Sequence, residues 1–461
     1  MSRRNMMLEI RYFAMRALFI ASVASAMAAG PARAAAADDE APVDQRQQEL
    51  IEVLRSDAPP QNKAIACKKL AVYGNKDAVP ALAALLADEK LAAWARIALE
   101  AIPDREADEA LREAMGKLEG KLLVGAINSI GTRRDADAVD ALVERLKDAD
   151  GEVAAAAAVA LGRIGGGAAV TALQQSLAAA TAAVHSAVAE GCILCAESLL
   201  AEGNSAEAAK LYDAVRKADV PKQRTLEATR GAILARGSGG VPLLAEQLQS
   251  ADKDAFNIGL RTARELAGRE VTGALMAELG RATPQRQALL ILALADRDDA
   301  AALPAMIEAA KSGALQTRIA AIRVLGRLGD ASCVPVLLDA ALEAEADLSQ
   351  AALAMLVELP GKDVDADVAA RLSKAEGKAR QVLIELAGRR HIAAAVPALL
   401  TAAEDPDAEI RSAALTALGY TVRPSDLPVL IARVADPSEN PEEAQAAESS
   451  LRVACKRMPD R

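Results

Sequence analysis

Two cysteines separated by two residues, Cys192 and Cys195, form the one redox-like motif of the sequence. Ala196 follows the motif, whereas covalent attachment of haem requires His at that position, and no strand–helix–strand pattern typical of a thioredoxin site surrounds it. On a helix the two thiols share a face, and they can form a disulfide there only with distortion. Two interpretations stay open: a redox site, or a pair of buried helix cysteines.

Histidines are too few for a metal centre, because the sequence holds only His185 and His391. A di-iron site built from repeated His–Glu pairs and a zinc site with closely spaced Cys and His are both excluded on that ground. Carboxylates are plentiful, but they gather in turns, such as Glu404 and Asp405, where they suit helix caps. We predict no catalytic residue, no metal and no cofactor, and therefore no enzyme activity.

The N-terminal residues have the pattern of an export signal. Four arginines precede an uncharged stretch at 17–30, which is too short to span a bilayer: Arg3, Arg4, Arg11 and Arg16. A small–x–small cleavage site follows at 32–34. We predict that residues 1–34 are a signal peptide, that the mature protein is periplasmic or secreted, and that it has no membrane span after the signal is removed.

The net charge of the chain helps to decide whether its partner is a protein or a nucleic acid. The chain has 54 basic and 64 acidic side chains, and without residues 1–34, which hold five Arg and one Glu, its net charge falls from −10 to about −14. Such a surface repels phosphate backbones, and aromatic residues, at 2%, are too few to stack on bases. We therefore predict a protein partner and no nucleic acid. An acidic concave surface would suit a basic partner.

A proline-containing motif repeats along the chain. The motif Val241-Pro242-Leu243-Leu244 has counterparts whose last residues lie at 306, 337, 399 and 430, and Leu275 and Val368 fill the gaps in phase. We call the last residue of each motif its anchor. The same spacing places further anchors at 82, 142 and 173. The period is 31 residues, and the composition is rich in the helix formers Ala and Leu. We predict an all-α fold, a right-handed α-solenoid of about twelve stacked helical hairpins.

Each repeat has the same internal order. A first helix, such as 317–325, ends at Gly326 or Gly329, where positive φ is expected, and a turn with a capping Asp, such as Asp77 or Asp330, follows. Proline then lies in the first turn of the second helix, where the backbone N–H has no partner to lose. We predict that these prolines stabilise the repeats: Pro80, Pro242, Pro304, Pro335, Pro397 and Pro428. Second helices, such as 335–342, are expected to line the concave face.

The run Leu325-Gly326-Arg327-Leu328-Gly329 before Val334, with its counterpart at 161–165, resembles the short HEAT-like repeats of the phycobilisome-lyase type. The resemblance covers about residues 61–461 and concerns the fold more than the function. It implies that the position twelve residues after each anchor commonly holds an Arg that bonds an acidic turn residue. Arg318, Arg380 and Arg411 match that position and are predicted to stabilise the repeats.

Two aromatic residues occupy the same position in other repeats. Trp94 and Phe256 lie twelve residues after an anchor and are candidates for partner binding. The alternative is that their rings pack between repeats. A lyase-like pocket for a bilin would need more aromatic residues than the mature chain offers. These are Tyr73, Trp94, Tyr212, Phe256 and Tyr420.

The repeat is interrupted once, because 71 residues separate Leu173 from Leu244, nine more than two periods. We predict a signal peptide at 1–34, a polar leader with a cap helix at 35–60, and HEAT-like repeats at 61–184 and at 221–461, the latter with a C-terminal cap. An irregular, longer, tetratricopeptide-like helical pair is predicted at 185–220. This pair is either a hinge or an inserted turn without function.

The function that this pattern favours is an exported, non-catalytic scaffold that binds a protein on the concave face of the solenoid. One alternative is an accessory subunit of extracytoplasmic sugar-processing or redox machinery. Another is a bilin-lyase-like or other enzyme of HEAT fold.

Overall fold

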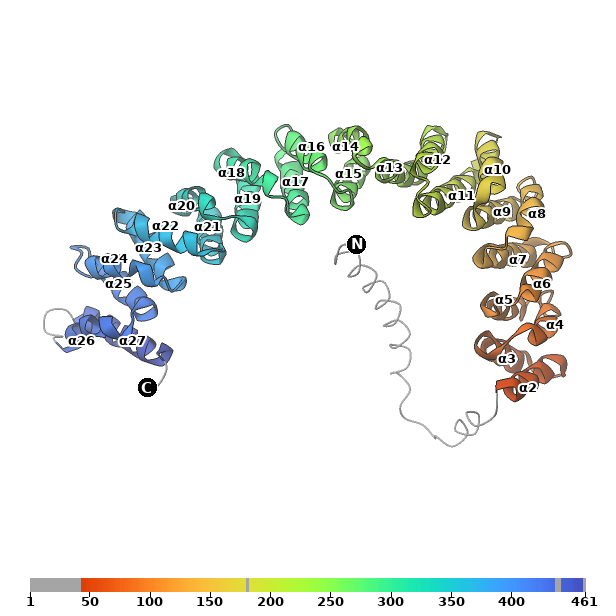
Figure 1. Ribbon diagram of the computed structural model, residues 1–461, viewed down its shortest axis with the longest axis horizontal. Helices are drawn as coiled ribbons and strands as arrows, with labels where there is room; N and C mark the ends of the chain where they lie inside the picture. The colour runs from red at the N-terminus through yellow and green to blue at the C-terminus, as the bar shows by residue number, and fades with distance from the viewer. Residues whose placement is uncertain (1–42, 180–181, 436–440, 459–461) are drawn as a thin grey trace. The chain divides into compact units, whose positions relative to one another are not determined.

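The computed structural model describes residues 43–179, 182–435 and 441–458, and in these ranges the chain forms helices joined by short turns, without a strand (Figure 1). The predicted all-α fold class is confirmed. The predicted signal peptide and residues 35–42 of the leader lie outside the described residues. The chain divides into two compact units, one up to Ala169 and one from Val170.

The N-terminal unit contains eight complete α-helices in its described part: α2 (Val43–Arg55), α3 (Pro60–Tyr73), α4 (Val79–Ala83), α5 (Ala92–Ala101), α6 (Arg105–Met115), α7 (Gly120–Arg133), α8 (Val139–Arg145) and α9 (Gly151–Ile164). Helix α10 (Gly166–Ala179) runs across the boundary between the units.

The C-terminal unit continues with α11 (Ala182–Ala201), α12 (Ser205–Lys217), α13 (Lys222–Arg236), α14 (Val241–Gln249), α15 (Lys253–Glu265), α16 (Arg269–Leu279), α17 (Pro284–Arg297), α18 (Leu303–Ser312), α19 (Leu315–Leu328), α20 (Val334–Leu342), α21 (Ala346–Glu358), α22 (Lys362–Leu372), α23 (Gly377–Arg389), α24 (Val396–Ala402), α25 (Ala408–Thr421), α26 (Leu427–Ala435) and α27 (Pro441–Arg457).

Each proline-containing helix pairs with the helix that follows it in the chain. Helix α18 packs along α19, and α20 packs along α21, whereas α17 and α18 are joined by a turn without extensive packing. The predicted repeat unit began one helix too early, so its phase was wrong although its period was right. A periodic pattern has no origin, and only packing distinguishes the two possible pairings.

The turns before the proline-containing helices are single 3₁₀ turns, and those before α4, α18 and α20 have a polar side chain as the cap. Asp330 accepts a hydrogen bond from the Ser332 N–H at 2.8 Å, as predicted. In the first repeat, however, Asn75 is the cap and accepts from the Asp77 N–H at 2.9 Å, so Asp77 does not have the predicted role. The six prolines lie at the first or second position of α4, α14, α18, α20, α24 and α26.

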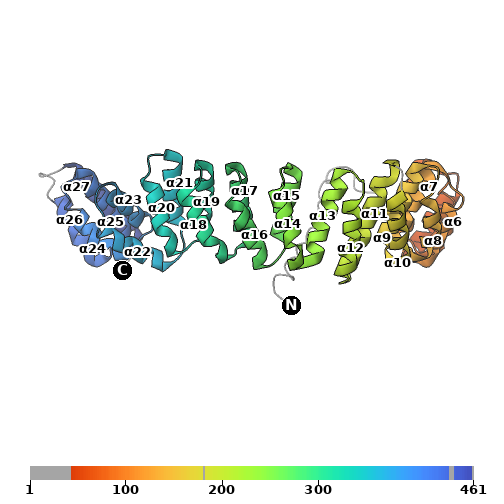
Figure 2. The ribbon, with the colours of Figure 1, turned by 90° about the horizontal axis from the view of Figure 1, so that it is seen from above.

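Helices of the same kind form two rows within each unit. We call α3, α5, α7 and α9, and α13, α15, α17, α19, α21, α23, α25 and α27, the inner row, because consecutive members pack side by side (Figure 2) and each unit curves toward them (Figure 1). The outer row consists of α2, α4, α6 and α8, and of the even-numbered helices from α14 to α26. The prediction that second helices such as 335–342 line the concave face is wrong, because this segment belongs to α20 of the outer row.

Glycines bring the inner helices close together. A Cβ atom on Gly131 of α7 would lie 2.7 Å from the Cα of Ala160 in α9, and one on Gly388 of α23 would lie 3.0 Å from the Cα of Ala417 in α25. The expected positive φ at Gly329 is absent, since its φ is −79° and a Cβ there would meet the Leu325 carbonyl oxygen at 2.4 Å. These glycines are needed for close packing rather than for a left-handed turn.

The interruption at 185–220 contains the 20-residue helix α11 and helix α12, whose Tyr212 is buried against Gly231 of α13. Among the described helices, α11 is the one that is long and apolar enough to cross a bilayer, with a mean hydropathy of 1.4 over Val184–Ala201. It packs against α12 and α13, and 44% of this segment is buried. A core helix has the same length and composition.

Candidate functional site

Large apolar side chains that remain exposed gather on the inner row. Nine such side chains occur in the described residues, and eight of them lie on inner helices: Ile65, Val72, Trp94, Ile97, Leu289, Leu292, Leu315 and Tyr420. The ninth, Ile431, lies on the outer helix α26. Because exposed apolar side chains that cluster mark interaction surfaces, the inner row is the candidate functional surface.

The largest group lies on α3 and α5 of the N-terminal unit. We call Ile65, Val72, Trp94 and Ile97 the N-terminal apolar patch. Trp94 and Ile97 follow each other at i and i+3, and the side chain of Trp94 is 40% exposed. Residues 29 apart meet across inner helices, as Arg96 and Gly125 do, and this register aligns Ile65 with Trp94.

Phe256, the other predicted partner-binding residue, is not available to a partner. It is 2% exposed in the core of α15, and the guanidinium of Arg286 lies 4.3 Å from its ring centre. The correction has a simple cause. At the start of α15 the ring packs among the buried residues of the hydrophobic core, which Trp94 at the equivalent position of α5 does not do.

The three predicted arginines bond turns at the ends of outer helices. Arg318 donates to Glu343 Oε2 at 2.8 Å and to the Ala310 carbonyl at 2.8 Å, and this hydrogen bond holds the pKa of the Glu343 carboxyl below its ordinary value. Arg380 forms an ion pair with the buried Asp405, and Arg411 donates to the Asp405 carbonyl at 2.8 Å. Arg380, Asp405 and Arg411 therefore link two neighbouring repeats. Their stabilising role stays a prediction.

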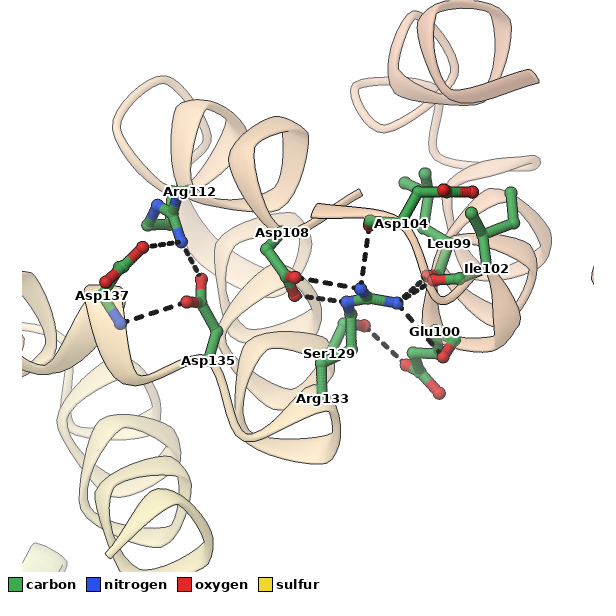
Figure 3. Close-up of polar contacts among 10 residues, drawn as sticks. All are labelled: Leu99, Glu100, Ile102, Asp104, Asp108, Arg112, Ser129, Arg133, Asp135 and Asp137. Atoms are coloured by element: carbon green, nitrogen blue, oxygen red, sulfur yellow. Dashed lines mark hydrogen bonds and ion pairs between the residues drawn. The ribbon is translucent and has the colours of Figure 1, made fainter. Parts of the chain in front are cut away.

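A second set of arginines went unnoticed in the sequence. Arg133 at the end of α7 donates to the carbonyls of Leu99, Ile102 and Asp104 at the end of α5, and to Asp108 of α6 (Figure 3). Its side chain is 7% exposed. The carbonyls of Leu99 and Ile102 lie at the C-terminal end of α5, where a helix leaves carbonyl groups without intrahelical partners. By bonding them, Arg133 joins one repeat to the preceding one.

The same contact recurs in other repeats, and each time the arginine bonds a carbonyl 31 residues earlier in the chain, which is one period. Arg297 donates to the carbonyls of Leu266 and Gly268 after α15, at 2.6 and 2.7 Å. Arg390 donates to those of Leu356, Val357 and Leu359 at the end of α21, at 2.7 to 2.9 Å. Arg327 and Arg457 make single contacts of this kind, with Ala295 and Val422.

This set had a signal in the sequence. Arg133, Arg297 and Arg390 each stand nine residues before an anchor of the repeat, at 142, 306 and 399. A search for polar residues in phase with every position of the period, and not with one position alone, would have found them.

A groove of about 940 Å³ lies on the inner row between α23 and α25 and is lined by Glu385, Arg389, His391 and Tyr420, among others. His391 Nδ1 lies 3.2 Å from the Tyr420 carbonyl oxygen, and the two ring centres are 5.7 Å apart. The imidazole thus contacts a backbone carbonyl. Side chains of both charges surround an aromatic ring in this groove, which suits a binding surface.

The cysteines of the redox-like motif lie in the core. Cys192 and Cys195 are buried thiols with 0% and 1% exposure, and burial raises the pKa of each to about 12. Burial also raises the pKa of Cys67 to about 11. A thiolate is the reactive form of cysteine, so these environments oppose redox chemistry. In the described residues no group of three or more His, Cys, Asp or Glu is placed to hold a metal ion.

Alkylation will distinguish a redox pair from core packing. In the native protein at pH 8, iodoacetamide is expected to modify Cys455, which is exposed, and to leave Cys67, Cys192, Cys195 and Cys333 unmodified. In 6 M guanidinium, on the order of the concentration that unfolds stable domains, all five should react. Mass spectrometry of tryptic peptides measures both, and rapid native modification of Cys192 would restore the redox interpretation.

Comparison with known proteins agrees with this architecture. A family model for HEAT repeats matches residues 119–192, 272–357 and 366–452, which together are more than half of the chain. No curated protein matches the chain in sequence. The structure of the karyopherin Kap121p bound to the extreme C-terminus of the protein phosphatase Cdc14p is 13% identical, with a TM-score of 0.51 over 98% of this chain and 57% of that chain.

Yeast importin-beta (Kap95p) is 12% identical, with a TM-score of 0.44 over 90% of this chain and 67% of that chain. The chain therefore spans little more than half of the Kap121p chain and about two thirds of Kap95p. At these identities the likeness concerns the fold alone. The stacked pairs, the two rows and the matched family model lead to one conclusion: the chain belongs to the HEAT-repeat family.

Proposed function

We propose that the protein is an exported, non-catalytic scaffold that binds a segment of a protein partner along the inner row of its solenoid. The observation that carries this proposal is the placement of the exposed large apolar side chains, eight of nine of which lie on inner helices. A few residues supply most of the binding free energy of a protein interface, and tryptophan, tyrosine and arginine are enriched among them. Trp94, the aromatic member of the N-terminal apolar patch, is the residue expected to contribute most.

The family supports a binding function and leaves the partner open. HEAT repeats build extended surfaces, and a relative in fold, Kap121p, binds the extreme C-terminus of another protein. The export signal supports an extracytoplasmic partner: four arginines, an uncharged stretch at 17–30 and a cleavage site at 32–34.

Site-specific photo-crosslinking tests the proposal. A photoreactive amino acid replaces Ile97 in the full-length chain, expressed in its native cells, and a matched variant carries it at Arg105 of the outer helix α6, whose side chain is 74% exposed. We expect a discrete protein adduct from position 97 and none from position 105. The adduct should contain the chain beginning at Ala35, which terminal peptide masses will report.

Two results would contradict the proposal. Equal adducts from both positions would show contact without preference for the inner row. The absence of any adduct at position 97, with the protein folded by circular dichroism, would show that the N-terminal apolar patch has no protein partner. An adduct on a chain that still begins at Met1 would contradict export alone.

A further inference from the structure

Charge is distributed unequally between the two rows of the N-terminal unit. The inner helices α3, α5, α7 and α9 contain seven basic and two acidic residues. The outer helices α2, α4, α6 and α8 contain five basic and nine acidic residues. The chain as a whole has a net charge of −10, so the inner row has the opposite sign. The expected acidic concave surface for a basic partner is therefore wrong for this unit.

Exposed basic side chains lie on α3 beside the N-terminal apolar patch and on α7, which packs on α5. Lys68 is exposed on α3, three residues after Ile65 and four before Val72, so all three share one face of the helix. Lys121 is exposed on α7, the inner helix that packs on α5, and α5 contains Trp94. The acidic side chain nearest in sequence to the patch, Glu100, accepts a hydrogen bond from Ser129 Oγ at 2.6 Å and is half-buried.

The same combination occurs independently in the C-terminal unit. Leu289 and Leu292 of α17 and Leu315 of α19 are exposed on the inner row. Helix α19 contains three arginines and no acidic residue, and its Arg323 is exposed. Two inner surfaces thus pair exposed leucine or isoleucine with exposed cations.

We infer that the N-terminal apolar patch recognises an amphipathic, acidic protein segment, with large apolar side chains on one face and carboxylates beside them. This inference rests on the proposed function and specifies its partner. The apolar side chains would bury against Ile65, Trp94 and Ile97, while the carboxylates would face Lys68 and Lys121. Complementary charge gives such a contact its specificity and its rate of association. An anionic nucleic acid lacks the aliphatic side chains that this patch would bury.

Synthetic peptides test the chemistry directly, because Trp94 is the one tryptophan of the chain and reports binding by fluorescence. The probe is a helical peptide without aromatic residues, with leucines on one face and glutamates on the other. Its matched control has lysine at every glutamate position. We expect the glutamate peptide to shift the Trp94 emission to the blue and to bind about tenfold more tightly than the lysine peptide. The difference should shrink as salt rises toward ~1 M.

Charge reversal in the protein locates the contact. The double variant Lys68→Glu/Lys121→Glu should weaken binding of the glutamate peptide about tenfold and strengthen binding of the lysine peptide. Lys117→Glu is the control, since this side chain follows the outer helix α6 and is 69% exposed. It should leave both affinities unchanged. All three replaced lysines are exposed, so the variants are expected to fold, and circular dichroism verifies this.

Three outcomes would overturn the inference. The first is equal or tighter binding of the lysine peptide, the second is an unchanged Trp94 signal with both peptides, and the third is equally tight binding of a single-stranded DNA of matched charge. Each leaves the crosslinking result at position 97 intact. A failure of the partner chemistry can therefore be told apart from a failure of the scaffold function.

Discussion

Replacing Arg133 by methionine is expected to lower the free energy of unfolding of the N-terminal unit by about 3 kcal/mol. Methionine keeps the aliphatic volume but removes the guanidinium, which leaves the carboxylate of Asp108 and the carbonyls of Leu99, Ile102 and Asp104 without their donor. Buried polar groups that lose their partners account for most of such losses.

Urea unfolding followed by Trp94 fluorescence measures this loss locally. Trp94 lies in α5, the helix whose end Arg133 occupies, so its emission reports the affected repeat. Arg105→Met is the control. Its side chain is 74% exposed, and its change should stay within about 0.5 kcal/mol. The double variant Arg133→Met/Asp108→Ala should lose less free energy of unfolding than the two single variants lose together. If Arg133→Met has the same midpoint of urea unfolding as the wild type, the capping role is refuted.

The same substitution, glycine to alanine, is expected to have opposite effects at two helical positions. At Gly131 the added Cβ would lie 2.7 Å from the Cα of Ala160, so α7 and α9 must separate, at a cost of about 2 kcal/mol. At Gly273 in the middle of α16 no atom lies within 4 Å of the new Cβ. There alanine should stabilise the helix by up to about 1 kcal/mol, because glycine has the lower helix propensity.

Thermal unfolding monitored by circular dichroism at 222 nm compares the two variants with the wild type. A decrease in Tm for Gly131→Ala and an increase for Gly273→Ala are the expected results. A rise in Tm at both positions would mean that the inner helices can separate without cost, and the close approach of their backbones would not matter for stability.

The sequence predicts the fold well because the prolines mark it. A proline in the first turn of a helix and an acidic cap before it are local features, so Pro335 and Asp330 could be interpreted without knowledge of the packing. The pairing of α20 with α21, and its place in the outer row, depend on contacts between segments. A periodic sequence fits either pairing equally well.

The candidate site was harder to predict, since exposure of a single side chain is decided by packing. Trp94 and Phe256 occupy equivalent positions of the repeat, yet the first is 40% and the second 2% exposed. Gly326 and Gly329 were interpreted as helix stops, although a Cβ on Gly326 would lie 2.5 Å from the Sδ of Met355, which identifies it as a packing position. The chemical type of each residue follows directly from the sequence, whereas its neighbours in space depend on how distant segments pack.

The arginines at the ends of the inner helices give the chain a direction. Arg133, Arg297, Arg390 and Arg457 each reach back to the helix end of the preceding repeat, and none of these contacts runs the other way. Repeats removed from the N-terminus would leave each remaining arginine-capped helix end occupied, while repeats removed from the C-terminus would uncover one. During synthesis, each of these repeats is therefore completed only when the next one has left the ribosome.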